Sequence, residues 1–391
     1  MPGHLSDIVD LARKTYLADE SDHPQFHFVP RLQAYPFWEM FLSDGLPIGG
    51  GASGIRGKLN LARSGTAGHT RPWAVNAPTV PNLTDEIRID WQYLQDDYSV
   101  ERHELLELFE QRRIGLTDVE GMVRAVADLV KIRREDCIHN MAELVEDEVF
   151  TAPYVISPSD ESEDHLYGLP YWFVKITAAQ VTSGGGQTAI CGDFQGGLPA
   201  AQDGTDFTSV AGIDPTATGK DLWKSWNETW DASDGSISDN DLQRMDNGFL
   251  MLNFKPPVKT TDYSATLFKL RMYAGRVTLL NYKKRRRQSN DQIGMDLAGP
   301  SGAVFNNVPI QHVPILNTST NANGNADYPL YFHNGRYLFP LILKGDNMRE
   351  STIPGDRDQH DVATTYINLT GNLKCTSRRE AGGVISYIAA A

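Results

Sequence analysis

The longest hydrophobic pattern in the chain predicts a helix over residues 117–150. Thr117 and Glu120 have the spacing of a capping box, in which each side chain satisfies an exposed backbone donor at the helix start. No glycine or proline interrupts residues 122–150, so the helix would be ~50 Å long at the standard rise per residue. Two interpretations fit this length: a long helix in a large core, or a spine on which a flat subunit packs. The apolar positions are Val119, Met122, Val123, Val126, Leu129, Val130, Ile138, Met141, Leu144, Val145 and Val149.

A second pattern, alternation of apolar and polar residues, predicts a half-buried strand over residues 86–94. The stretch before it, 45–82, is rich in glycine and too long for an ordinary connection. We therefore predict a long projecting hairpin whose return strand is 86–100, and we expect residues 50–68 to add little to the core. The alternating residues are Ile87, Ile89, Trp91 and Tyr93 on one side and Arg88, Asp90 and Gln92 on the other.

The N-terminal pattern predicts an arm. Residues 5–17 have the spacing of a short amphipathic helix, after which Pro24, Pro30 and Pro36 favour extended chain. Aromatic residues crowd the same stretch, and an extended arm has little core of its own. We therefore expect the arm to pack on another surface, such as a second subunit.

In the second half of the chain, the sequence patterns that predict helices and strands are shorter. Trp223, Trp226 and Trp230 have helical spacing, and we interpret them as core or interface anchors rather than as a platform for a sugar. Ser238 is placed to cap a helix over 239–252. Residues 367–375 suggest a closing pair of strands that turns at Gly371-Asn372.

Composition narrows the class of protein. The 391 residues carry a formal net charge of −14, which argues against a broad basic face for nucleic acid. The three cysteines are far apart, so neither a disulfide framework nor a zinc site is expected. The first residues lack the pattern of a signal peptide, and no apolar run approaches the ~20 residues needed to cross a membrane.

The sequence contains none of the common catalytic motifs. Gly54 to Lys58 has some likeness to a phosphate-binding loop, but Ala52 replaces its first glycine and Leu59 its hydroxyl residue. There is no nucleophile elbow and no zinc-binding H-E-x-x-H pair. The acidic loops at 160–165 and 356–361 are interpreted as solvated polar loops rather than cation sites. We predict no catalytic, cofactor or metal site.

From about residue 35 onward, the order of these features resembles the tailed-bacteriophage major capsid proteins of the Hong Kong 97 fold. The arm is followed by the glycine-containing loop, the strand EIRIDW at 86–91 and the long helix. The C-terminal third adds FNNVPI at 305–310, VPIL at 313–316, YPLY at 328–331, GDNMR at 345–349, HDV at 360–362, NLKC at 372–375 and SRR at 377–379.

The resemblance implies an α+β fold of the Hong Kong 97 type, with peripheral and axial domains. It implies a subunit that assembles into hexamers and pentamers of an icosahedral shell around phage double-stranded DNA, in the virion after assembly in the bacterial cytoplasm. The implied partners are further copies of the chain, a scaffolding protein, a portal, a decoration protein and DNA bound without sequence specificity. The implied division is 1–45 arm, 46–97 extended loop, 98–235 peripheral domain, 236–346 axial domain and 347–391 return to the peripheral domain.

For such a subunit the functional residues are contacts between copies. We expect them in the arm, in the loop and near the C-terminus, where an arginine pair would meet an acidic neighbour. The candidates are Phe26, Phe28, Tyr35, Phe37, Trp38, Arg56, Lys58, Arg63, Arg378 and Arg379. One compact basic cluster stands apart from them: Lys283, Lys284, Arg285, Arg286 and Arg287. We interpret it as a solvated face paired with acidic residues, with packaged DNA or an acidic neighbour as the alternative.

Some members of the family join a loop lysine to an asparagine of a neighbour. Lys58 is the only lysine in 46–97, and Asn347, Asn368 and Asn372 are the candidate acceptors, but we expect a shell held without cross-links. Two other functions stay open. One is an encapsulin-like shell around protein cargo, and the other is a β-rich carbohydrate-active hydrolase that uses the acidic loops and the tryptophans.

Overall fold

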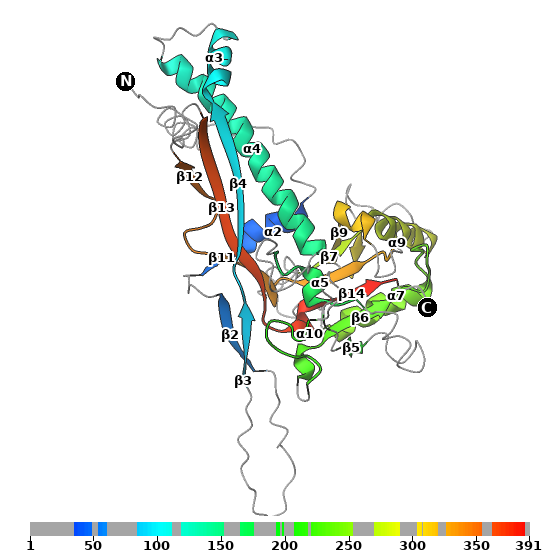
Figure 1. Cartoon of the computed structure of the whole chain (residues 1–391). Helices are drawn as coiled ribbons and strands as arrows, with labels where there is room; N and C mark the ends of the chain where they lie inside the picture. Colours follow the sequence, from blue (N-terminus) through cyan, green and yellow to red (C-terminus); the bar gives the residue numbers. More distant parts are fainter. Residues whose placement is uncertain are drawn as a thin grey trace, which may run out of the picture.

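The described strands form two large β-sheets and one two-stranded hairpin, and each large sheet pairs strands that are far apart in the sequence. The computed structural model describes residues 35–48, 54–60, 84–111, 119–151, 165–175, 193–195, 198, 207–217, 220–252, 270–289, 303–306, 308–319, 326–353 and 362–387. A long sheet with one long helix forms one side of the molecule, and a second sheet with two helices forms the other (Figure 1).

The first sheet is built around one strand, β13. It pairs antiparallel with β4 over ten positions, and on its other side with β11 and β12. Strand β1 extends this sheet by parallel pairing with β11. The members are β1 (Leu46–Ile48), β4 (Gln92–Glu101), β11 (Leu338–Leu343), β12 (Arg349–Ile353) and β13 (Val362–Cys375).

Strand β13 corrects the predicted strand pair, because its fourteen residues run on without a turn at Gly371-Asn372. A Cβ at Gly371 would lie 2.8 Å from the carbonyl oxygen of Leu341 and 3.0 Å from the ring of Phe41. Glycine stands there because the neighbouring strand and a helix approach the backbone closely, and not because the chain reverses.

The long helix prediction is confirmed by α4 (Val119–Thr151), 33 residues that lie along the first sheet (Figure 1). Its buried positions recur at helical spacing, at Val126, Val130, Met141, Val145 and Val149. The predicted cap at Thr117 lies outside the described residues. Helix α3 (Arg102–Gln111) precedes α4. Among the described helices, none combines the length and the apolar character that a membrane crossing requires.

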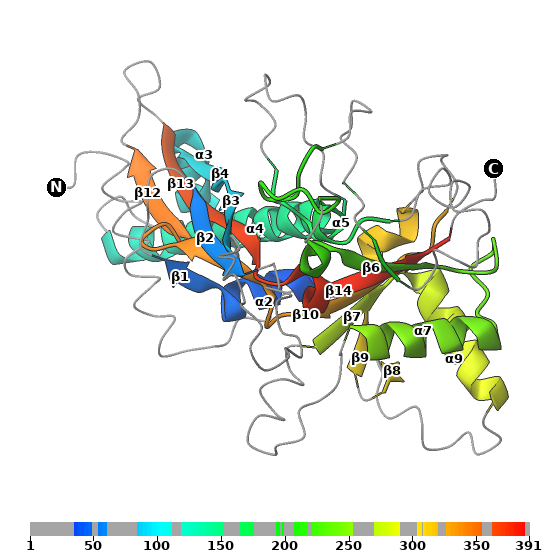
Figure 2. The same ribbon diagram turned by 90° about the horizontal axis from the view of Figure 1, so that it is seen from below.

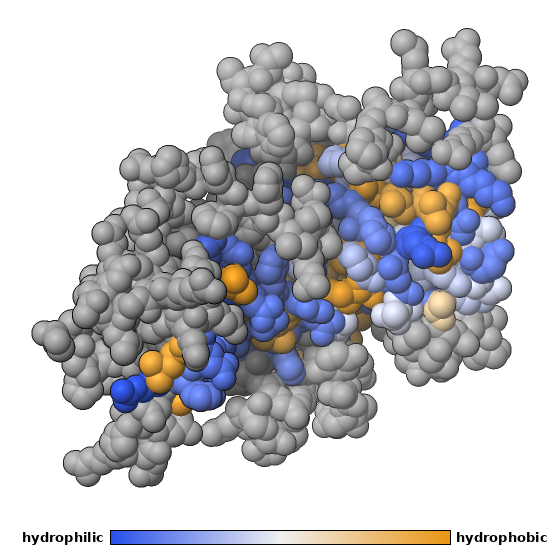
Figure 3. Space-filling view, turned by 90° about the horizontal axis from the view of Figure 1, so that it is seen from above, coloured by the Kyte–Doolittle hydropathy of each residue, from blue (hydrophilic) through white to orange (hydrophobic). Residues whose placement is uncertain are grey.

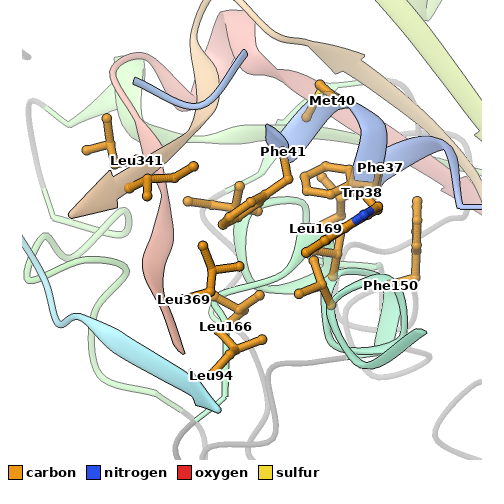
Figure 4. Close-up of a cluster of buried hydrophobic side chains, with 14 of the residues drawn as sticks. Phe37, Trp38, Met40, Phe41, Leu94, Phe150, Leu166, Leu169, Leu341 and Leu369 are labelled. Atoms are coloured by element: carbon orange, nitrogen blue, oxygen red, sulfur yellow. The ribbon is translucent and has the colours of Figure 1, made fainter. Parts of the chain in front are cut away.

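Helix α2 (Pro36–Asp44) corrects the prediction of an extended arm as far as residue 45. Pro36 occupies the first turn, where its fixed φ favours a helix and its missing N–H costs nothing. Phe37, Trp38 and Phe41 are at most 3% exposed and pack with Leu341, Leu369 and Phe150 in one hydrophobic core (Figure 4). These aromatic residues stabilise their own subunit. Residues 5–17 lie outside the described part of the chain.

The predicted hairpin is confirmed at its base, where β2 (Ile55–Asn60) and β3 (Thr84–Ile89) pair antiparallel (Figure 1). The predicted return strand is two strands, because β3 ends at Ile89 and β4 begins at Gln92 in the first sheet. Ile55 is buried, and so the expectation that residues 50–68 add little to the core is wrong for β2.

The second sheet has seven strands of mixed direction. Its order is β5 (Asp193–Gln195), β6 (Ser225–Thr229), β14 (Gly382–Ser386), β10 (Leu330–Asn334), β7 (Leu270–Ala274), β9 (Val308–His312) and β8 (Val304–Phe305). Helix α7 (Asp239–Met251) packs on β6, and α9 (Arg276–Ser289) packs on β9 (Figure 2). The remaining described helices are short: α5 (Leu169–Trp172), η2 (Asp221–Trp223), η3 (Pro314–Thr318) and α10 (Arg378–Ala381).

Two local predictions in this part are confirmed. Ser238 caps α7, and its hydroxyl accepts from the backbone of Asp241 in a reciprocal capping box. Trp223, Trp226 and Trp230 are at most 4% exposed, as expected for core anchors. Their helical spacing is misleading, since Trp223 ends η2 and Trp226 lies on β6.

The sheets cross the predicted domain boundaries. Strand β6 falls in the predicted peripheral segment 98–235 but belongs to the second sheet, and β11 falls in the predicted axial segment 236–346 but belongs to the first. Strand β14, near the C-terminus, returns to the middle of the second sheet. The two sheets therefore do not follow the division into 98–235, 236–346 and 347–391, which stays a prediction as a division into peripheral and axial domains.

Candidate contact surfaces

The β2–β3 hairpin has an apolar face and a basic face. Ile55, Ile87 and Ile89 are buried on one side. On the other side Arg56 lies directly opposite Arg88, and all four outward residues, Arg56, Lys58, Glu86 and Arg88, are exposed. Like charges directly opposite each other destabilise a strand pair. None of the three cations forms an ion pair with another described residue.

A turn of the chain at 207–217 holds the base of this hairpin. The backbone N–H of Arg88 donates to the carbonyl of Ala211 over 2.9 Å, and Ala211 N–H donates to the hydroxyl of Tyr171 over 2.7 Å. Lys220 forms an ion pair with Asp85 on β3. Ala211 has a left-handed φ of 51° and Gly212 one of 83°, and Gly212, with Asp214 and Pro215 after it, is the kind of sequence signal from which this turn could have been predicted. These contacts fix the direction in which the hairpin projects.

An open hollow of about 660 Å³ lies between β4 and the middle of α4. Its walls carry Asp97 and Glu101 from the strand and Glu135 and Asp136 from the helix, and none of these carboxylates forms an ion pair with another described residue. Ile132 lies among them with 65% of its surface exposed. We call this hollow the β4–α4 groove.

The one arginine that lines the groove is engaged in its own chain. Arg133 donates to the carbonyl of Ser99 and pairs with Glu104 at 2.5 Å. It ties α4 to β4 and α3 and neutralises a carboxylate outside the groove. The groove therefore remains acidic. Sequence reasoning missed it, because its walls come from a strand and a helix that were predicted separately.

The prediction that the two C-terminal arginines meet an acidic neighbour is wrong for Arg378, whereas for Arg379, which is partly exposed, it stays a prediction. Arg378 is fully buried, and its guanidinium donates to the carbonyls of Trp172 (2.6 Å) and Trp223 (3.3 Å). Burial lowers the pKa of Arg378 to about 10. Arg379 stacks on the ring of Phe194, 3.9 Å from its centroid. Arg378 thus joins α10 to two distant segments of its own subunit and offers no surface to an acidic neighbour.

The basic cluster lies on α9 and is partly paired, in line with the solvated-face interpretation. Arg285 forms an ion pair with Asp239 of α7, and Arg286 donates to the carbonyl of Val304 over 2.6 Å. Lys283 is half-buried, Lys284 is exposed, and the side chain of Arg287 lies outside the described residues. On the surface seen in Figure 3, hydrophobic residues form separate patches among hydrophilic ones.

The remaining candidates divide by exposure. Lys58 and Asn347 are exposed and Asn368 is half-buried, whereas Asn372 is buried and donates to the carbonyl of Asp90 over 2.8 Å. Asn372 is therefore out of reach as an acceptor for a cross-link. Tyr35 is half-buried at the start of α2. Phe26, Phe28 and Arg63 lie outside the described residues.

No metal or nucleophile site emerges in the described part of the chain. It contains no group of three or more His, Cys, Asp or Glu side chains placed to hold a metal. Burial raises the pKa of the Cys375 thiol to about 12 and raises that of Cys137 further. Both thiols are therefore poor nucleophiles at neutral pH. His165, from one of the acidic loops, pairs with Glu148 at 3.2 Å; the loop 356–361 lies outside the described residues.

Solved capsid structures share this fold. The capsid asymmetric unit of cyanophage A-1(L) matches with a TM-score of 0.54 and 13% sequence identity, covering 93% of this chain and 94% of that chain. The capsid of a native GTA particle matches with a TM-score of 0.50 and 12% identity, covering 96% of each chain. No protein-family profile and no curated protein matches the sequence. The chain has the Hong Kong 97-type fold of phage capsid subunits.

Proposed function

We propose that the protein is the major capsid subunit of a tailed bacteriophage and that its function resides in contacts between copies. The observation that carries this proposal is the match to a phage capsid subunit over 93% of this chain and 94% of that one. Because both chains are covered almost end to end, the likeness extends over nearly the whole of each polypeptide and is not limited to one sheet or one helix.

Charges without an ion-pair partner among the described residues support the same function. The outer face of the β2–β3 hairpin is basic in a protein of net charge −14, and Arg56 opposes Arg88 without a described acidic partner. A soluble monomer gains nothing from like charges across a strand pair. In an assembled shell, the same basic face is stabilised where it meets an acidic surface on a neighbouring copy.

In this proposal the copies form hexamers and pentamers of an icosahedral shell that encloses double-stranded DNA. Lys284 and the neighbouring cations of α9 are candidates for contact with that DNA or with an acidic partner. A scaffolding protein, a portal and a decoration protein are the partners we expect. The protein has no enzymatic role in this scheme, and its place is the virion capsid.

The buried tryptophans speak against the rival hydrolase. A sugar-binding platform needs exposed aromatic faces, whereas Trp223, Trp226 and Trp230 are at most 4% exposed.

Expression with electron microscopy and light scattering tests the proposal. We expect the protein to form closed particles or capsomers, either by itself or with a co-expressed scaffolding protein. Extraction of the particles then separates the two kinds of shell, since nuclease-protected DNA supports the phage capsid and an enclosed enzyme supports the encapsulin-like alternative. A monodisperse monomer under every salt condition, scaffolding protein included, contradicts both.

A further inference from the structure

The β2–β3 hairpin joins the rest of the subunit at two adjacent interruptions of regular structure. It is a separate two-stranded sheet, since β3 ends at Ile89 and β4 of the first sheet begins at Gln92. Gly54, directly before β2, has a φ of 98°, and a Cβ there would lie 2.7 Å from the carbonyl oxygen of Ile89. The angle between the hairpin and the first sheet therefore depends on a few backbone dihedral angles near Gly54 and Ile89.

The turn at 210–213 is bonded to β3 near this point. Val210 and Ile213 exchange backbone hydrogen bonds of 2.9 and 3.1 Å, and both residues between them have a positive φ, 51° at Ala211 and 83° at Gly212. Positive φ at both central positions is the pattern of a tight type I′ turn. The carbonyl of Ala211 accepts from the backbone N–H of Arg88 over 2.9 Å. An alanine is disfavoured in this conformation, so the contacts around the turn must hold it there.

The same turn is bonded to segments that lead to the second sheet. Ala211 N–H donates to the hydroxyl of Tyr171 over 2.7 Å, and the indole N–H of Trp223 donates to the carbonyl of Val210 over 3.1 Å. Arg378 of α10 donates to the carbonyl of Trp223, and α10 continues directly into β14 in the middle of the second sheet. In Figure 1 the chain around this turn lies between β3 and α10. One series of hydrogen bonds thus runs from the hairpin to the second sheet.

We propose that the 210–213 turn couples the angle of the β2–β3 hairpin to the position of the second sheet, with Tyr171 and Ala211 as the positioning residues. The inference rests on the proposed shell function. Contacts between copies close a shell of one size only if each copy presents its contact surfaces within a narrow range of angles. A turn that holds the hairpin from the side of the second sheet narrows that range. Because coupling between two parts is reciprocal, a change at the hairpin should also reach α10.

Removal of the Tyr171 hydroxyl tests this series of hydrogen bonds. Tyr171→Phe keeps the ring but leaves Ala211 N–H without its acceptor. The matched control is Tyr282→Phe on α9, which removes a hydroxyl that donates to the carbonyl of Val304 over 2.9 Å in another part of the subunit. The readouts are urea unfolding, amide hydrogen exchange of β3 and α10 in the purified subunit, and particle diameters by electron microscopy after assembly.

A second set of variants tests the connection from outside the core. Lys220 follows the turn in the sequence and forms an ion pair with Asp85 on β3. K220D and D85K each place like charges next to each other, whereas the combined variant restores the pair with its signs exchanged. This set decides the question if Tyr171→Phe does not fold, which circular dichroism establishes.

We expect the amides of β3 to exchange about tenfold faster in Tyr171→Phe than in Tyr282→Phe at a similar free energy of unfolding, and the amides of α10 to change in the same direction. Tyr171→Phe, K220D and D85K should give particles of mixed diameter, and K220D/D85K should return to one diameter. The coupling is overturned if Tyr171→Phe matches its control in exchange and diameter, if D85K leaves the exchange of α10 unchanged, or if the combined variant stays mixed.

These outcomes are distinguishable from a failure of the proposed function. If the unaltered chain forms shells and the variants behave like the control, the shell function stands and the coupling does not. An unaltered chain that never assembles contradicts the shell function, and the exchange of β3 and α10 then decides the coupling by itself.

Discussion

Glu146 of α4 accepts a hydrogen bond from the backbone N–H of Phe37, 3.0 Å away, in the first turn of α2. The same carboxylate oxygen accepts from Trp38 N–H at 3.2 Å, and the residue is fully buried. Tyr35 gives α2 no side-chain cap, so a residue more than a hundred positions away caps it instead. The long helix thus holds the point at which the first 34 residues join the subunit.

The first prediction concerns this cap and pH. Burial raises the pKa of Glu146 to about 8, against an ordinary value of 4.5. Between these values the folded chain keeps a proton that the unfolded chain releases, so Glu146 lowers stability as pH rises, by up to ~1.4 kcal/mol per pH unit. Glu146→Gln keeps an acceptor for both N–H groups and should remove this loss, leaving the variant at least as stable above pH 8. Urea unfolding from pH 5 to 9 measures it.

The control for this prediction is Glu146→Ala, which removes the acceptor as well as the charge. It should be less stable than Glu146→Gln by ~1–3 kcal/mol at every pH, because two buried N–H groups lose their partner, and it should share the flatter pH dependence of the Gln variant. A Gln variant that shows the same pH slope as the unaltered chain would mean that another group carries the titration.

A second prediction concerns acid. His333 is fully buried, and burial lowers its pKa to about 4 from an ordinary value of 6.5. As the pH falls below 6.5, His333 becomes protonated in the unfolded chain, whereas in the folded chain it stays neutral until about pH 4. The free energy of unfolding therefore decreases as the pH falls through this window. His333→Gln, which can still donate to the carbonyl of Leu338, should flatten that acid limb. Thermal melting between pH 4 and 7 measures it; an unchanged limb contradicts the assignment.

Sequence patterns predicted the elements that depend on neighbours in the chain. The helix α4 follows from apolar spacing within each few turns, and the cap of α7 follows from Ser238 directly before the helix. The base of the hairpin follows from alternation on β3. Each of these signals comes from residues close together in the sequence, so it can be recognised without knowledge of the fold.

The predictions that failed depend on contacts between distant residues. Gly371 has the sequence character of a turn, but it serves the packing of Phe41 and Leu341. Arg378 has the character of a surface cation, but its partner Trp172 lies 206 positions away. The groove is likewise formed by β4 and α4 only after both pack together. Nothing near these residues in the sequence distinguishes the two roles.

The third prediction concerns the effect on stability of replacing Arg378, with the replacement of its neighbour Arg379 as the control. Arg378→Leu leaves the carbonyls of Trp172 and Trp223 without their buried donor and should lower stability by ~2–4 kcal/mol. Arg379→Leu loses only its stacking on Phe194, worth ~0.5–1 kcal/mol at a half-exposed site. Urea unfolding of the purified monomers compares them. Equal stability of the two variants would restore the interpretation of Arg378 as a surface contact.

The last prediction separates the hairpin's base from the chain beyond it. Asn60 and Thr84 are paired at the end of β2 and β3, so residues 61–83 can be replaced by an Asn-Gly link, which suits a two-residue turn between antiparallel strands. Ile55, Ile87 and Ile89 stay buried in this variant, and a shorter loop changes the closure entropy only logarithmically. We therefore expect a folded monomer that no longer forms shells, because the removed segment includes Arg63, one of the residues predicted to contact a neighbouring copy.

The matched control replaces residues 50–68 with a Gly-Ser linker. This change deletes β2 and uncovers Ile87 and Ile89, and so it should unfold or strongly destabilise the subunit, unlike the Asn-Gly variant. Circular dichroism and melting report the fold, and electron microscopy reports assembly. Normal shells from the Asn-Gly variant would show that residues 61–83 are dispensable for assembly. A well-folded 50–68 variant would show instead that β2 stabilises the subunit less than the burial of Ile55 implies.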